Sequence, residues 1–324
     1  MIRFAVLGSG SSGNCSVVSM GHDHVLIDIG LSARQIEQRL ESIGLVADQI
    51  SAVVLTHEHS DHTCGLDVFL RKRAGLPVFA TSHTCAVVKE GLRRQPKWQV
   101  FHAGDAFAVG TFEVESFSVP HDAVDPVGFV FRGEGLGLGS LSDTGHVTHL
   151  IRERLRDLDA LHVEANYDEM LLQNDRKRPW ATKQRISSRH GHLSNTQAAD
   201  LVAEVASERL RWVVLNHLSK DCNNAPLAGG EVGKALRQRG LDQVTVHCAS
   251  QKTPLPFLEI RPPAPACSDA LAADSTGRDQ AGAARSQQSH HSSPARGLQE
   301  DPSPFVHQIL PLTEYVQQEW GFEN

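Results

Sequence analysis

The chain has 324 residues, of which 40 % are apolar, so it can bury a sizeable core in one large domain or two ordinary ones. No apolar run is long enough to span a bilayer, and the first residues, MIRFAVLGSG, lack the charged and apolar segments of a secretory signal. The six cysteines are scattered without a CxxC pair, as is usual for reduced thiols. We therefore expect a cytoplasmic protein without a membrane partner.

The formal net charge of −7 is unevenly distributed. Three arginines and eight acidic residues follow residue 262, which leaves the rest of the chain nearly neutral, with 28 basic and 30 acidic residues. Within that part, residues 176–190 (RKRPWATKQRISSRH) contain six Lys or Arg and one Trp but no acidic residue. Such a stretch can bind a polyanion, although an ordinary solvated face explains it equally well.

Short β-type runs alternate with helix-type segments from Ile2 to about Pro262, which predicts an α/β fold. The expected strands are Arg3–Leu7, Cys15–Ser19, His24–Ile27, Ala52–Thr56, Val78–Ala80, Phe112–Phe117, Val127–Phe131, Ala160–Glu164, Trp212–Asn216 and Val244–His247. The expected helices are Ser32–Ser42, Asp61–Ala74, Ser82–Arg94, Val147–Arg156, Asn195–Ala206 and Gly229–Arg239.

The composition changes after Arg261. Residues 263–304 are rich in Ala, Ser and Pro and poor in large apolar residues, which predicts a disordered linker. Residues 305–324 regain Phe, Leu, Tyr and Trp, which predicts a short C-terminal segment that docks. The body of this chain is the simpler docking site, and the sequence does not identify a protein partner.

The motif THEHSDH places three histidines, a glutamate and an aspartate within six consecutive positions after an apolar run. His57 and His59 are two residues apart, so on an extended backbone both side chains point toward one ion. Asp61 and His62 are adjacent at the start of a helix and point in different directions, which suits a second ion beside the first. The spacing therefore predicts a two-metal site.

Four ligands cannot complete two coordination spheres, so further ligands must come from the ends of other strands. His121 follows the expected strand Phe112–Phe117, Asp143 follows a glycine-rich run, and His217 follows Trp212–Asn216. Of these three residues the middle one, Asp143, is an aspartate, which is useful because one carboxylate can bridge two cations and offset their charge.

This pattern resembles the metallo-β-lactamase fold superfamily, in which an HxHxDH loop, a later histidine, an aspartate in a DTG-like turn and a strand-end histidine bind two metals. More narrowly, the chain resembles the YycJ/WalJ-type members, described as DNA exonucleases, in seven segments that occur in the same order. These segments are LGSGSSGNCSVV, LTHEHSDHTCGL, HDAVDPVGF, SDTGH, VEANYDEMLL, RISSRHGHLSN and LNHLSKDCNNAP. The resemblance implies that residues 1–262 form a catalytic αββα sandwich of two mixed sheets flanked by helices.

The resemblance also implies how the ligands divide between two ions. One ion would be held by His57, His59, His121 and Asp143, and the other by Asp61, His62, Asp143 and His217. Imidazole and carboxylate ligands suit Zn²⁺ or Mn²⁺ and also accept Fe²⁺.

Other residues are candidates for catalysis and for orienting the ligands. Asp61 could orient the attacking water as well as bind metal, and His192 in RHGHLSN is the best candidate for the proton donor to the leaving group. The alternative for His192 is a brace for the following helix. Glu164 and Asn166 in VEANYD end a strand and could hold ligands in place, although an ordinary turn is an equally good explanation.

Two segments are candidates for substrate binding. The loop GSGSSGN, with Ser11 and Asn14, could hold a phosphate, although a tight turn between strands explains it equally well. In the basic stretch, Lys183, Arg185 and Arg189 are the candidates for gripping a nucleic-acid backbone.

These features favour a dinuclear phosphodiesterase that acts on nucleic acid through a metal-activated water, and the resemblance implies a 5′→3′ exonuclease on DNA. A hydrolase of small substrates, such as a thioester, a lactam or a cyclic nucleotide, would have the same metal site with different loops. A non-catalytic, metal-stabilised binding module is the third hypothesis, and the ligand set together with His192 argues against it.

Overall fold

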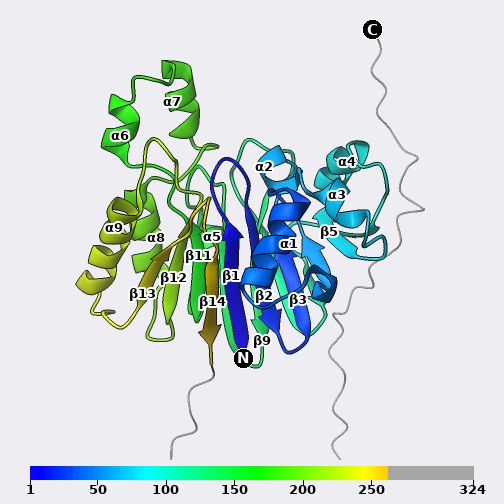
Figure 1. The fold of residues 1–324 in the computed structure, drawn as a ribbon. Coiled ribbons are helices and arrows are strands. Elements are labelled where there is room, and N and C mark those ends of the chain that lie inside the picture. The colour runs from blue at the N-terminus through cyan, green and yellow to red at the C-terminus, as the bar shows by residue number, and fades with distance from the viewer. Residues whose placement is uncertain (262–324) are drawn as a thin grey trace, which may run out of the picture. The chain divides into compact units, whose positions relative to one another are not determined.

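The computed structural model describes residues 1–261, and the expectations for residues 263–304 and 305–324 fall outside this part. Two sheets of seven strands form its centre (Figure 1). In spatial order, the first sheet comprises β14 (Leu255–Ile260), β1 (Ile2–Gly8), β2 (Cys15–Met20), β3 (Asp23–Ile27), β4 (Ala52–Val54), β5 (Pro77–Thr81) and β6 (Lys97–Phe101). The second comprises β13 (Thr245–Cys248), β12 (Trp212–Asn216), β11 (Ala160–Glu164), β10 (Leu136–Leu141), β9 (Val127–Gly133), β8 (Phe112–Ser118) and β7 (Ala106–Val109).

The two sheets share one topology. In the first, β14 to β3 pair antiparallel and β3 to β6 pair parallel. In the second, β7 to β10 pair antiparallel and β10 to β13 pair parallel. In the second sheet, the strands that precede the expected ligands, β8, β10 and β12, therefore run in the same direction, and their carboxyl ends lie at one edge.

Helices form most of the connections between the parallel strands, because such a connection must cross the sheet. In the first half of the chain, which contains β1 to β6, they are α1 (Ala33–Ser42), η1 (Ala47–Gln49), α2 (Ser60–Thr63), α3 (Leu66–Leu70) and α4 (Ser82–Glu90). In the second half they are α5 (His149–Leu155), α6 (Glu169–Asn174), α7 (Trp180–Ile186), α8 (Asn195–Val205) and α9 (Ala225–Gln238). None of the helices within residues 1–261 combines the length and apolar character needed to cross a bilayer.

Alternation of side chains along the strands builds three apolar layers. In β12, Trp212 and Val214 point into the core between the two sheets, whereas Val213 and Leu215 pack against the helices outside. The first sheet is covered in the same way, with Ile36 of α1 in the outer layer. These layers make an αββα sandwich of two mixed sheets, which confirms the predicted fold class.

The expected helix Asp61–Ala74 is wrong as a single helix. It divides into α2 and α3 at Cys64 and Gly65. A Cβ atom on Gly65 would lie 2.0 Å from the Leu31 carbonyl oxygen, so the backbone of this turn passes too close to its neighbour for any side chain.

Four strands, two α-helices and the short 3-10 helix were not expected from the pattern, namely β6, β7, β10, β14, α6, α7 and η1. The glycine-rich sequence of β10 lacks the β-branched residues typical of strands. A Cβ atom on Gly139 would lie 2.5 Å from Leu155 Cδ2 of α5, so the glycine allows this helix to pack closely on the sheet. Packing of neighbouring elements, rather than local propensity, determines this strand.

Candidate metal centre and active site

Four of the expected ligands come from the turn after β4. The backbone is extended through His59, which precedes the first residue of α2, and Asp61 and His62 lie in the first turn of that helix. His57 and His62 are buried, whereas Asp61 is half-buried. The turn therefore presents His57 and His59 on the extended segment and Asp61 and His62 on the helix, as the spacing predicts.

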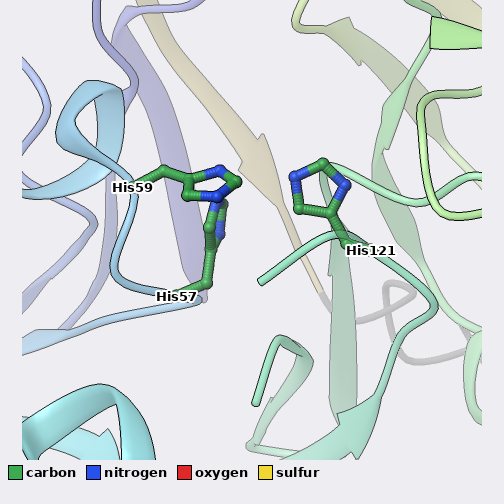
Figure 2. Close-up of side chains that lie close together, drawn as sticks. All are labelled: His57, His59 and His121. Carbon is green, nitrogen blue, oxygen red and sulfur yellow. The ribbon is translucent and has the colours of Figure 1, made fainter. Parts of the chain in front are cut away.

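The second half of the chain supplies the other ligands from separate strands. His121 follows β8, Asp143 follows β10 and His217 follows β12, and all three are buried. His57, His59 and His121 bring ring nitrogens within 4.8 Å of one another, and Figure 2 shows their rings converging. Asp61, His62 and His217 form a second cluster by the same criterion. Each cluster thus combines residues of the turn after β4 with one residue that follows a strand of the second sheet.

Asp143 lies between the two clusters. Its Oδ2 atom is 3.2 Å from His62 Nε2, and its Oδ1 atom is 3.9 Å from His121 Nε2 and 3.0 Å from His217 Nδ1. Burial alone would raise the pKa of Asp143, but His217 and His62 outweigh it and hold this pKa well below its usual value. The carboxylate is therefore ionised and faces both clusters, as a bridging ligand must.

Asp28 orients His62 and was not singled out from the sequence. It follows β3 and is buried, with Oδ2 2.8 Å from His62 Nδ1. Since a carboxylate can only accept, the Nδ1–H of His62 donates and Nε2 is directed at the centre. Thr56 donates its backbone N–H and its hydroxyl group to the same carboxylate at 2.8 and 2.9 Å, which fixes the position of Asp28.

Glu164 performs the same task for two imidazoles. Its Oε1 atom accepts from His192 Nδ1 at 2.7 Å and from His217 Nδ1 at 3.0 Å. Its Oε2 atom accepts from the backbone N–H groups of Thr144 and Leu193 at 3.0 and 3.3 Å. This fully buried carboxylate therefore links the candidate metal ligand His217 to His192, and leaves Nε2 of both rings free to act.

The backbone at the centre adopts an unusual conformation. Asp28, Asp143 and His217 have φ angles of 62°, 53° and 52°, in the left-handed region that residues other than glycine seldom adopt. Asn166 helps to hold the last of these turns, because its Nδ2 atom donates to the His217 carbonyl oxygen at 2.8 Å. Such conformations are typical of functional sites, where the surrounding structure enforces them.

The imidazole groups of the two clusters have the properties expected of cation ligands. The buried atoms His57 Nε2 and His217 Nε2 have no hydrogen-bond partner within residues 1–261. Burial lowers the pKa of His57 well below its usual value, so this ring is neutral and can donate a lone pair. Burial would also lower the pKa of His62, but Asp143 and Asp28 raise it to about 10, so this position calls for a positive charge that a cation can supply.

The loop between β1 and β2 packs against the turn from His57 to His62. The Oδ1 atom of Asn14 accepts from Gly10 N at 2.9 Å, and its Nδ2 atom lies 3.1 Å from His62 Nε2. A Cβ atom on Gly13 would lie 2.1 Å from the Gly30 carbonyl oxygen, so this turn requires glycine. Asn14 is buried and Ser11 is exposed, which supports the tight-turn interpretation for Asn14 and leaves Ser11 facing solvent.

The three basic candidates lie on α7 and after it. Arg185 Nε donates to Asp122 Oδ2 at 2.5 Å, and Asp122 Oδ1 lies 3.3 Å from His121 Nε2. Lys183 donates to the Gln173 carbonyl oxygen, and Arg189 contacts His146 Nε2 at 3.3 Å. Arg185 is thus paired with a carboxylate beside the candidate ligand His121, whereas Lys183 and Arg189 contact no carboxylate within residues 1–261.

Comparison with known proteins identifies the family and the relatives of this chain. Residues 23–217 match the family described as Beta-lactamase superfamily domain. The chain is 34 % identical over 258 residues to Exodeoxyribonuclease YycJ of Bacillus anthracis, covering 78 % of this chain and 97 % of that protein. It is 32 % identical over 265 residues to Exodeoxyribonuclease WalJ of Streptococcus pneumoniae, covering 80 % and 98 %.

The fold also matches a solved structure, the metallo-beta-lactamase fold protein YhfI from Bacillus subtilis. The TM-score is 0.60 at 14 % identity, over 80 % of this chain and 100 % of that chain. The chain therefore belongs to the metallo-β-lactamase superfamily and, within it, to the family of the YycJ and WalJ proteins. Its family match and its exodeoxyribonuclease relatives, which it covers almost completely, make it a metal-dependent hydrolase.

Proposed function

We propose that this chain is a dinuclear phosphodiesterase that removes nucleotides from the 5′ end of DNA. The observation that carries the proposal is the pair of ligand clusters around Asp143, with His192 beside them. The named activity of the relatives, exodeoxyribonuclease, directs the proposal toward DNA.

One ion would be held by His57, His59, His121 and Asp143, and the other by Asp61, His62, Asp143 and His217. The donor types suit Zn²⁺ or Mn²⁺, and Fe²⁺ is compatible. When bound, two such cations supply Lewis acidity toward water and toward a phosphoryl oxygen.

Two side chains then handle protons. Asp61 is half-buried, with a side chain 24 % exposed, so its carboxylate can accept a hydrogen bond from the attacking water and orient it toward phosphorus. His192 is oriented by Glu164 through Nδ1, which leaves Nε2 as the atom that gives a proton to the leaving oxygen. The new bond joins water oxygen to phosphorus, and the bond that breaks joins phosphorus to the leaving oxygen.

The experiment that tests the proposal uses linear DNA labelled at either its 5′ or its 3′ end, with Mn²⁺ or Zn²⁺. We expect early release of 5′-labelled mononucleotide by the unaltered chain and none by the Asp61→Ala variant. His149→Ala is the matched control, because this histidine is 87 % exposed and lies outside the clusters.

Early release of 3′-labelled mononucleotide would overturn the polarity. If neither DNA nor RNA is cleaved with any metal by a chain that contains two bound ions, the small-substrate hydrolase becomes the better explanation.

A further inference from the structure

Residues 168–190, here called the 168–190 arm, leave the second sheet after β11 and return before α8. A β-bridge between Tyr167 and Ser194 joins the two ends of the arm. Figure 1 shows its helices, α6 and α7, standing clear of the sheets. No side chain of helix α7 is fully buried, and only Ile186 packs against an apolar cluster, that of Tyr167, Leu172 and Cys222, so core packing does not explain the rest of its sequence.

The first residue of α7 is a tryptophan that faces solvent. Trp180 is 68 % exposed, whereas Trp212 in the core is 4 % exposed. Lys183, Gln184 and Ser187 follow at three, four and seven residues, so they lie on the same face of the helix. An exposed indole offers a large flat apolar surface, which suits contact with another flat ring.

The basic residues of the arm differ in how they are paired. Lys177 and Arg178 form ion pairs with Asp221, and Arg185 pairs with Asp122. Within the part of the chain that the structure describes, Arg176, Lys183 and Arg189 form no ion pair with a carboxylate. Three uncompensated positive charges therefore lie near Trp180 and along the arm toward the metal centre.

The far end of the arm is attached to the metal centre. The carbonyl oxygen of Gly191 accepts from His121 Nδ1 at 3.0 Å, and Arg185 reaches Asp122 beside the same ligand. A helix rises about 1.5 Å per residue, so Trp180 lies roughly 7.5 Å along the axis from Arg185. At a rise of about 3.4 Å per nucleotide in a stacked strand, this segment alone spans about two nucleotides, and the Arg185 side chain and Asp122 add further distance to the centre.

We propose that the solvent-facing side of α7 is a binding site for single-stranded DNA, in which a base at least two nucleotides from the scissile phosphate stacks on Trp180. Arg176, Lys183 and Arg189 would contact the phosphates of the same strand. Alternating aromatic and cationic contacts are how proteins hold single strands without reading their sequence. The inference rests on the proposed nuclease function and adds to it a site away from the reacting phosphate.

The test compares Trp180→Ala with Trp180→Phe, which keeps an aromatic ring. Val46→Ala is the control, since Val46 is also exposed but precedes β4, away from the strand ends that hold the metal ligands. For a 12-nucleotide single strand, we expect KM to rise about tenfold or more in Trp180→Ala and to change little in Trp180→Phe. For a dinucleotide and for thymidine 5′-p-nitrophenyl phosphate, which do not reach the indole, all variants should match the unaltered chain.

Two outcomes separate failure of this inference from failure of the proposed function. An unchanged KM for the 12-nucleotide strand in Trp180→Ala, with DNA still degraded, would overturn the stacking site alone. If the unaltered chain releases no nucleotide, the proposed function fails, and fluorescence anisotropy of a labelled 12-nucleotide strand still tests the site. In that measurement, equal binding by the unaltered chain and Trp180→Ala would overturn the inference.

Discussion

The two halves of the molecule have the same strand topology but build the metal centre in different ways. The first half supplies four candidate ligands from one turn of six residues, His57 to His62. The second half supplies single candidate ligands from the ends of separate strands, namely His121, Asp143 and His217. A single turn can be recognised in a sequence, whereas ligands from three strands come together only in the folded sheet.

The halves also differ in how they orient the ligands. In the first half, Asp28 holds one imidazole, that of His62. In the second half, Glu164 holds two imidazoles, that of the ligand His217 and that of His192. Under the proposed function, the second half would couple metal binding to proton donation through one carboxylate, so substitutions in the two halves should have different consequences.

The largest effect is expected at the ligand that faces both clusters. Asp143→Asn keeps the shape of the side chain but removes the charge that bridges the clusters, so kcat/KM should fall by about 10³-fold or more. Circular dichroism should remain that of a folded chain. Activity within tenfold of the unaltered chain would remove Asp143 as the bridging ligand.

A nearly equal effect is expected at the proposed proton donor. His192→Ala should lower kcat on DNA by about 10²- to 10⁴-fold, while metal content stays unchanged. The loss should be much smaller for a p-nitrophenyl ester, because p-nitrophenolate leaves without needing a proton. An equal loss on both substrates would mean that His192 supports the structure and does not donate the proton.

The two orienting carboxylates allow the halves to be compared directly. Asp28→Asn and Glu164→Gln should each weaken metal binding by about 10- to 100-fold. At saturating metal, Asp28→Asn should recover its kcat, whereas Glu164→Gln should not, because His192 has lost its partner as well. Titration of activity with Mn²⁺ measures both quantities, and identical recovery of the two variants would contradict the coupling through Glu164.

The smallest effect concerns stability at the boundary between the sheets. His162 of β11 is buried against Phe4 of the first half, and burial lowers its pKa to about 3. On unfolding, its pKa returns to about 6.5, so the unfolded chain binds an extra proton between these values. Its contribution to stability is therefore present above pH 6.5 and is lost as the pH falls toward 3.

Comparison with His162→Gln isolates this effect. Between pH 6.5 and 4.5, the metal-free unaltered chain should lose about 2 to 3 kcal/mol more free energy of unfolding than the variant, because other titrating groups are common to both. Urea unfolding at the two pH values provides the measurement. Parallel losses in the two proteins would show that His162 is protonated in the folded chain.

The sequence predicted the parts of the site that depend on local spacing. The alternation of His57 and His59 on an extended segment and the position of Asp61 and His62 in a helical turn follow from backbone geometry alone. The αββα class and the division of the ligands between two ions came from the resemblance. His121 and His217 were nominated because each follows an expected strand, and Asp143 because it follows a glycine-rich run.

The parts that the sequence did not predict depend on contacts between distant segments. Asp28 follows β3 as an isolated aspartate, and only its contact with His62 distinguishes it from an ordinary turn residue. The available signal was weak: an aspartate directly after a buried strand and close to a glycine. Helix α7 was missed because it is short and has no fully buried side chain within the described residues, so it has no apolar periodicity.

The most direct test of the central claim is the metal content of the purified chain at saturating Zn²⁺ or Mn²⁺, measured by inductively coupled plasma mass spectrometry. The two clusters around Asp143 predict two ions per unaltered chain and fewer in the Asp143→Asn variant. One ion or none in the unaltered chain, or two ions retained with equal affinity in the variant, would contradict a dinuclear centre bridged by this aspartate.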